Sequence, residues 1–107
     1  MRPIEFQILL TLAAGERHGY AIIQDIEERS NGALRVETGT LYRAIQRLLE
    51  AELVQATEPA RDAASDDERR RYYAITATGK RAAADEARRM ASLVDAARNA
   101  RLIPEAT

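Results

Sequence analysis

The chain has 107 residues, the length of one domain, and 46% of them are hydrophobic, which predicts a folded protein. It contains no cysteine, so disulfides, thiolate catalysis and cysteine-based zinc sites are excluded. Its formal net charge is −1, which argues against a non-specific coat on DNA and against adhesion to membrane surfaces. The charge still permits a sequence-specific DNA reader whose basic residues gather on one face.

A first helix is predicted from Pro3, which suits an initial turn, to Gly15, which is expected as a left-handed cap. The apolar run at 8–14 is too short to span a membrane, so we expect an unexported, cytoplasmic protein without membrane partners. The apolar stripe of this helix consists of Ile4, Ile8, Leu9 and Leu12.

A short second helix follows a polar turn at 16–19 and stops at the turn signal of residues 30–32. Residues 34–36 predict a short β-like segment. The carboxylates within 25–28 are expected on a solvated face of this helix. Its apolar stripe consists of Tyr20, Ile22, Ile23 and Ile26.

A third helix is predicted after residues 38–40, where Thr38 and Thr40 offer capping hydroxyls. Leu41, Ile45, Leu48 and Leu49 point to one side, and the polar residues point to the other. Arginine forks onto guanine and glutamine pairs with adenine, so this side predicts major-groove contacts, with a merely solvated face as the alternative. We expect base contacts from Arg43, Gln46 and Arg47, and phosphate contacts from Thr38, Thr40 and Tyr42.

Two strands are predicted at 53–57 and 70–75, separated by a polar loop. They form a hairpin of the kind called a wing, whose arginines favour the DNA backbone or the minor groove. We expect such contacts from Arg69, Arg70 and Arg71. Acidic residues in the same loop oppose them, so a solvated loop with internal ion pairs is the alternative.

A last helix of twenty or so residues is predicted after Thr76, a good N-cap. Its apolar positions step by four and three, which is the spacing of a coiled-coil seam. This seam predicts a homodimer, with packing on the first helix as the alternative. The seam residues are Ala83, Ala87, Met90, Val94 and Ala97.

The order of elements indicates a mainly α fold with a small β-hairpin: a winged helix-turn-helix at 1–76 and a dimerisation helix at 77–107. His18 is the single histidine, so a histidine metal site or a Ser-His triad is not expected, and neither is a cofactor. We expect His18 to make a hydrogen bond in the turn beside Gly19. No enzyme activity is predicted.

Three segments then resemble the PadR-like transcriptional regulators: residues 8–22, residues 39–48 and residues 70–79. The resemblance implies a bacterial repressor that dimerises through one C-terminal helix and leaves its operator when a small aromatic or apolar effector binds. By motif position it implies DNA contacts from Thr40, Tyr42, Arg43 and Arg47. The chain has no tryptophan, which some relatives use to stack flat ligands. Met90 and Leu93 are candidates for a small apolar site, with seam packing as the alternative.

The leading prediction is therefore a regulator that binds double-stranded DNA as a dimer on a near-palindromic operator. The alternative is a winged helix that docks on another protein without binding DNA.

Overall fold

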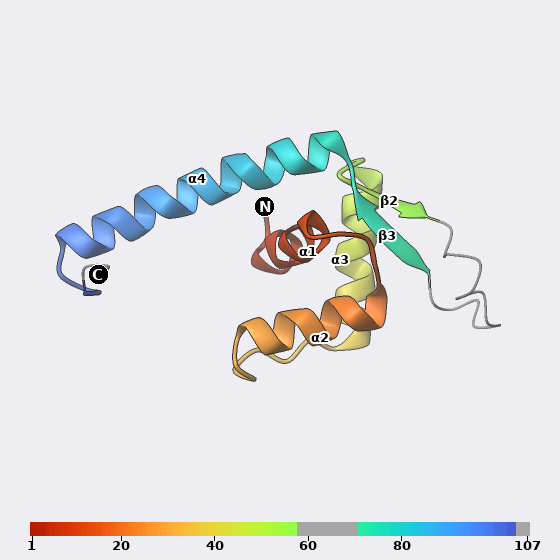
Figure 1. Cartoon of the computed structure of the whole chain (residues 1–107), viewed down its shortest axis with the longest axis horizontal. Coiled ribbons are helices and arrows are strands. Elements are labelled where there is room, and N and C mark those ends of the chain that lie inside the picture. Colours follow the sequence, from red (N-terminus) through yellow and green to blue (C-terminus); the bar gives the residue numbers. More distant parts are fainter. Residues whose placement is uncertain (58–70, 105–107) are drawn as a thin grey trace.

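The computed structural model describes residues 1–57 and 71–104, which form four helices and a small sheet (Figure 1). The fold class predicted from the sequence, mainly helical with a small antiparallel hairpin, is confirmed. The elements in chain order are α1 (Pro3–Ala13), β1 (Arg17–His18), α2 (Gly19–Arg29), α3 (Thr38–Glu50), β2 (Val54–Thr57), β3 (Tyr72–Ile75) and α4 (Ala77–Asn99).

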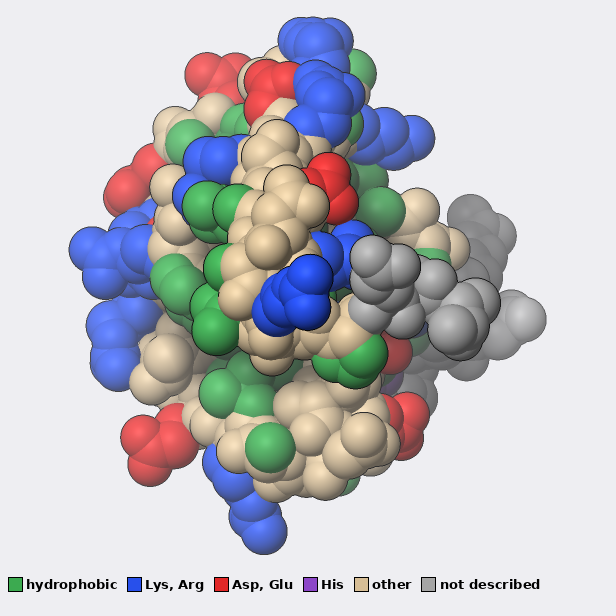
Figure 2. All heavy atoms as spheres, turned by 90° about the vertical axis from the view of Figure 1, so that its left-hand side faces the viewer, with side chains coloured by type: hydrophobic (Ala, Val, Ile, Leu, Met, Phe, Trp, Pro, Cys, Tyr) green, Lys and Arg blue, Asp and Glu red, His purple; other side chains and the backbone are tan. Residues whose placement is uncertain are grey.

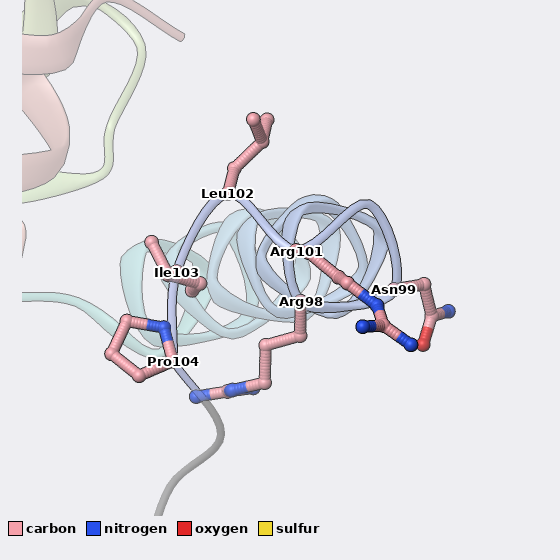
Figure 3. Close-up of a pocket in the computed structure, with 6 residues that line it drawn as sticks. All are labelled: Arg98, Asn99, Arg101, Leu102, Ile103 and Pro104. Atoms are coloured by element: carbon pink, nitrogen blue, oxygen red, sulfur yellow. The ribbon is translucent and has the colours of Figure 1, made fainter.

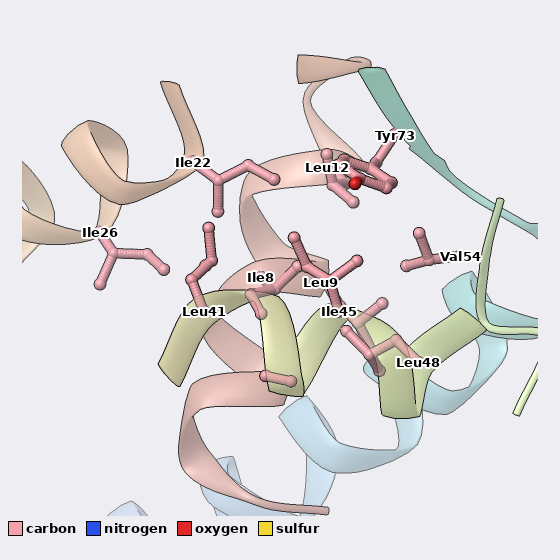
Figure 4. Packing of buried hydrophobic residues seen from close by; sticks show 11 residues of the cluster. Ile8, Leu9, Leu12, Ile22, Ile26, Leu41, Ile45, Leu48, Val54 and Tyr73 are labelled. Carbon is pink, nitrogen blue, oxygen red and sulfur yellow. The ribbon is translucent and has the colours of Figure 1, made fainter. Parts of the chain in front are cut away.

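The core lies between α1, α2, α3 and the sheet, and the predicted apolar stripes supply most of it (Figure 4). Leu41, Ile45 and Leu48 of α3 pack against α1, while Val54 and Tyr73 close the core from the sheet. Tyr20 was wrongly predicted in the stripe of α2, because it stands in the first turn with 60% of its surface exposed. The buried apolar residues of the first two helices are Ile8, Leu9, Leu12, Ile22 and Ile26.

The acidic residues of α2 lie on an outer, solvated face as expected, with the Asp25 side chain 45% exposed, and two of them also bond to neighbouring segments. The hydroxyl of buried Thr11 in α1 donates to Asp25 over 2.7 Å. The Glu27 carboxylate accepts the backbone N–H of Val36 over 3.2 Å. Residues 34–36 are accordingly no strand, because a side chain and not a neighbouring strand takes this N–H group.

The sheet has three strands in the order β1-β3-β2, so β3 is its centre. The hairpin of β2 and β3 was predicted from the sequence, although residues 58–70 lie outside the described residues. The polar turn predicted at 16–19 is wrong in part, because Arg17 pairs with Tyr73 and His18 with Tyr72. His18 also caps α2, since its Nδ1 accepts the N–H of Ala21 over 3.1 Å, as expected for a turn hydrogen bond.

Two helix ends differ from the prediction. The C-cap of α1 is Ala14 in a right-handed conformation. Gly15, predicted to be a left-handed cap, follows it with φ +147°, outside the left-handed helical region. The N-cap of α3 is Glu37 without a side-chain hydrogen bond, so Thr38 and Thr40 stand inside the first turn rather than capping it. Both hydroxyls therefore stand on the first turn of α3 without a capping role.

Helix α4 begins as predicted at Thr76, whose hydroxyl accepts the N–H of Gly79 over 2.9 Å. Only its first part lies on α1, and it then extends away from the other elements (Figure 1). Its 23 residues give a length of about 34 Å at a rise of about 1.5 Å per residue. Most of α4 is therefore not covered by its own chain.

Candidate nucleic-acid interface

The side of α3 opposite the core carries most of the residues predicted to meet DNA. Side chains in a helix turn by about 100° per residue, which places Gly39, Arg43 and Gln46 near the centre of this side. Thr38 and Tyr42 flank them on the edge toward the sheet, and Tyr42 is 37% exposed. We call these five residues the outer face of α3.

Arg43 is exposed and lies over Gly39, with its Nη1 only 3.3 Å from the position that a Cβ at Gly39 would take. Its Nη2 donates weakly to the Thr40 hydroxyl over 3.4 Å. Within residues 1–57 and 71–104, no carboxylate forms an ion pair with this guanidinium. Arg43 can therefore exchange its present contacts for an acceptor outside the chain at little cost.

Arg47 differs from the other predicted contacts because it is bound to α1. Its Nε donates to Oε2 of Glu5 over 2.6 Å, and the Glu5 side chain is only 13% exposed. Burial raises the pKa of Glu5, but the hydrogen bond from Arg47, the N–H of Arg2 and the two guanidinium charges outweigh it and lower this pKa below 4.5. The structure therefore gives Arg47 a partner inside the protein that the sequence did not reveal.

This pKa predicts how the ion pair contributes to stability. A carboxyl whose pKa is lowered by folding stabilises the folded state above its unfolded pKa, and this contribution is lost as the pH falls through the folded value. We expect wild type to be more stable than Glu5→Gln at pH 7, and the difference to shrink as the pH falls below 4.5. Urea denaturation at several pH values measures it. A difference between the two proteins that does not change with pH would contradict the shifted pKa.

A surface groove of about 580 Å³ separates α3 from the sheet and joins the outer face to the base of the wing. Arg71 and Tyr73 line it from the β3 side, and Ala56 lines it from β2. Arg71 is exposed at this place, whereas Arg69 and Arg70 lie outside the described residues. The other lining residues are Thr38, Tyr42, Ile45, Gln46 and Leu49.

The aromatic residues at the start of α2 were not predicted from the sequence to lie beside the interface. The ring of Tyr20 stacks on His18 at 6.4 Å, and Tyr72 of β3 meets His18 edge-on at 5.5 Å. The Tyr42 hydroxyl lies only 2.2 Å from where a Cβ at Gly19 would be, so a side chain there would displace it. The start of α2 thus borders both α3 and the wing. The one sequence feature that pointed to this close approach is Gly19, the glycine between His18 and Tyr20.

The predicted seam on α4 is mostly uncovered. Val94 is 39% exposed and Ala87 is also exposed, while Met90 and Ala97 are partly covered. Ala83 differs, because it packs against the core of its own chain. On the face seen from the left of Figure 1, hydrophobic side chains appear in separate groups among charged ones (Figure 2).

Further apolar side chains stand at the C-terminal end of α4. Leu93 is 57% exposed and Leu102 is 77% exposed. Leu102 points away from the end of the helix, and Ile103 and Pro104 lie on the turn that follows it (Figure 3). Of the two candidates for an effector site, Met90 is partly covered and Leu93 is exposed. The end of α4 therefore extends the exposed apolar surface beyond the predicted seam.

Neither a metal site nor a membrane-spanning helix is found in the described part of the chain. Among residues 1–57 and 71–104, no three His, Asp or Glu side chains come together in a way that would hold a metal ion. In the same residues no helix combines the length and the apolar character needed to cross a bilayer.

The fold and the outer face of α3 define the class of protein. Helices α2 and α3 with the hairpin of β2 and β3 form a winged helix-turn-helix, with α3 in the place of a recognition helix. A family model described as the transcriptional regulator PadR-like family matches residues 8–85. The chain belongs to this family, whose members are transcriptional regulators and not enzymes.

One relative in sequence is a protein of Lysinibacillus sphaericus, 37% identical over 73 residues, which are 68% of this chain and 64% of that protein. The chain thus matches less than two thirds of that relative's length.

Solved structures of PadR proteins share the fold. A PadR-like regulator from Bacillus cereus has a TM-score of 0.71 at 24% identity, covering 95% of this chain and 93% of that one. A PadR family regulator from Clostridium difficile has a TM-score of 0.74 at 22% identity, covering 90% and 95%. Bacillus subtilis PadR, solved in complex with operator DNA, has a TM-score of 0.67 at 21% identity, covering 79% and 46%.

Proposed function

We propose that this protein regulates transcription by binding double-stranded DNA with the outer face of α3 in the major groove. The observation that carries the proposal is the exposed Arg43, which lies on that face beside Gln46 and without a carboxylate partner among the described residues. Arginine reads guanine through two hydrogen bonds, and glutamine reads adenine in the same way. The solved operator complex of Bacillus subtilis PadR, which shares the fold, supports this role.

Phosphate contacts are proposed around this face. Thr38, Thr40 and Tyr42 stand at the start of α3, where hydroxyls and backbone N–H groups fix a protein on the DNA backbone. Arg71 at the base of the wing lines the same groove as Thr38 and Tyr42. Arg69 and Arg70 belong to the same proposal on the strength of the sequence alone. Tyr20 joins them because it is exposed and follows Gly19, against which the Tyr42 hydroxyl lies.

We propose a homodimer formed through α4, with residues 1–76 as the DNA-binding part and residues 77–107 as the dimerisation part. The exposed Val94, the protruding helix and the apolar residues at its end support this division. A two-fold dimer presents two copies of α3 about one DNA turn (~34 Å) apart and reads a near-palindrome. Among the seam residues, Ala83 packs against the core of its own chain. The proposed contacts with the partner copy therefore come from Ala87, Met90, Val94 and Ala97.

Two further proposals are a repressor role and release from DNA by a small apolar or aromatic effector, and both rest on the family alone. A cytoplasmic location is proposed from the sequence. No cofactor is part of the proposal.

A protein-docking role is the second candidate, and the net charge of −1 together with the exposed Glu50 near the outer face favours it. Docking on a protein and binding to DNA differ in their response to salt, because phosphate contacts release counterions and make affinity fall steeply with salt. Selection of bound sites from a random duplex library, followed by salt titration of the selected duplex, separates the two roles. An inverted repeat with a steep slope supports the regulator, and no enrichment with a flat slope supports docking.

Replacing Arg43 tests the base contact directly. We expect Arg43→Met to cost about 1–3 kcal/mol in binding to the selected duplex and to relax selection at one position of each half-site. Thr78→Ala, an exposed position in the first turn of α4, is the control and should bind like wild type. Equal weakening on all duplexes would make Arg43 a phosphate contact, and unchanged binding would contradict its place in the interface.

A further inference from the structure

Arg47 stands on α3 at the border between the outer face and the core. It follows Arg43 by four residues and therefore points about 40° further round the helix, toward α1 rather than toward the middle of the outer face. Its side chain is 36% exposed. At this position on α3 the long side chain of Arg47 is able to reach a phosphate of DNA bound to the outer face. The hydrogen bonds of Arg47 within the protein therefore decide whether it makes that contact.

Those contacts turn the guanidinium to α1. The Nε edge of Arg47 meets Glu5 at 2.6 Å, which is a short, charge-assisted hydrogen bond. Glu5 is the more buried partner, with 13% of its side chain exposed against 36% for Arg47. Moving Arg47 to DNA would leave a poorly hydrated carboxylate without its nearest cation, because Arg2 lies 3.8 Å away and is 68% exposed.

Arg43 provides the contrast. It is the same residue type one turn earlier on the same helix, and its guanidinium meets only the Thr40 hydroxyl at 3.4 Å among the hydrogen bonds of the described residues. Two arginines that the sequence placed together on one face are thus held differently, one by a partly buried carboxylate of another helix and one by a weak local contact.

We propose that Glu5 is a positioning residue that holds Arg47 against α1 and so keeps this cation off DNA, leaving base reading on α3 to Arg43 and Gln46. The inference rests on the proposed function, because it assigns roles within the same DNA interface. In this arrangement α1 does not enter the major groove, but through Glu5 it limits how many cations of α3 can contact the phosphates.

The experiment compares wild type, Glu5→Gln, Arg47→Met and the double variant on one mixed-sequence duplex over a range of salt concentrations. We expect Arg47→Met to keep the wild-type salt slope. We expect Glu5→Gln to bind several-fold more tightly at low salt and to steepen the slope by about 0.9 per protein copy, since Arg47 becomes free to meet a phosphate. In the double variant both gains should disappear, which separates release of Arg47 from the loss of a negative charge.

Each contrary result is distinct. A gain from Glu5→Gln that persists in the double variant would overturn the proposal, because it would come from net charge. A Glu5→Gln protein that binds like wild type would also overturn it, and so would a flatter slope for Arg47→Met. If Glu5→Gln does not fold, as judged by circular dichroism, the slope of Arg47→Met decides alone. Wild type that binds no duplex would remove the proposed function itself, and the inference with it.

Discussion

Replacing Gly79 by alanine should destabilise the protein by about 3 kcal/mol, at the upper end of what forced overpacking costs. Gly79 is buried in the first turn of α4, and a Cβ there would lie 2.0 Å from the carbonyl oxygen of Leu53 and 2.8 Å from Cγ1 of Ile75. The carbonyl cannot move freely, because it accepts the N–H of Thr76 over 3.0 Å. Thermal unfolding should show a midpoint lower by on the order of 10 °C or more.

Gly39→Ala is the matched control, since it places the same methyl group at another helical glycine. There the nearest atom is Nη1 of the Arg43 side chain at 3.3 Å, and a flexible side chain can move aside. The substitution should be neutral or stabilise by about 0.5–1 kcal/mol, because alanine favours the helix. Equal losses at the two positions would show that the Leu53 carbonyl is not the cause.

Replacing Val94 by aspartate should leave the protein folded but monomeric. Val94 is 39% exposed in the isolated chain, so the charge costs little there, whereas in the proposed dimer two unpaired carboxylates would be buried. Light scattering should give half the wild-type mass. Affinity for a two-half-site operator should fall by at least about 100-fold, because the two lobes no longer bind as one unit.

Ser92→Asp adds the same charge to α4 on the side opposite Val94, since two residues back along the helix is about 200°. It should remain dimeric and bind DNA nearly as wild type does. An unchanged mass for Val94→Asp would contradict the seam, and a monomer for both variants would mean that charge on α4, rather than its place, dissociates the dimer.

Local patterns predicted the elements whose cause is local. The apolar spacing in α1 and α3 identified the core, and the hydroxyl of Thr76 marked the start of α4 because it bonds to an N–H only three residues ahead. The hairpin was likewise visible as two alternating runs joined by a polar segment. In each case the signal is a short pattern within one element, although the pairing of β2 with β3 joins residues as far apart as Val54 and Ile75.

What the sequence did not reveal depends on partners far away in the chain. Strand β1 has two residues and no strand pattern, and it exists because Tyr72 and Tyr73 pair with it. The ion pair of Arg47 joins residues 42 positions apart, so helical spacing placed Arg47 with Arg43 although α1 holds it. In the candidate interface the positions on α3 were predictable, but the orientation of each side chain was not.

The central position of β3 has a mechanical consequence for DNA binding. Its residues pair with β2 on one side and with Arg17 and His18 on the other, and His18 is also the cap of α2. The base of the wing is therefore paired through β3 with Arg17 and His18, directly before the start of α2. If α3 and Arg71 both contact DNA as proposed, the distance between these two contacts along the duplex is therefore fixed. Operators of this protein should tolerate little change in the distance between the bases read by α3 and the backbone beside the wing.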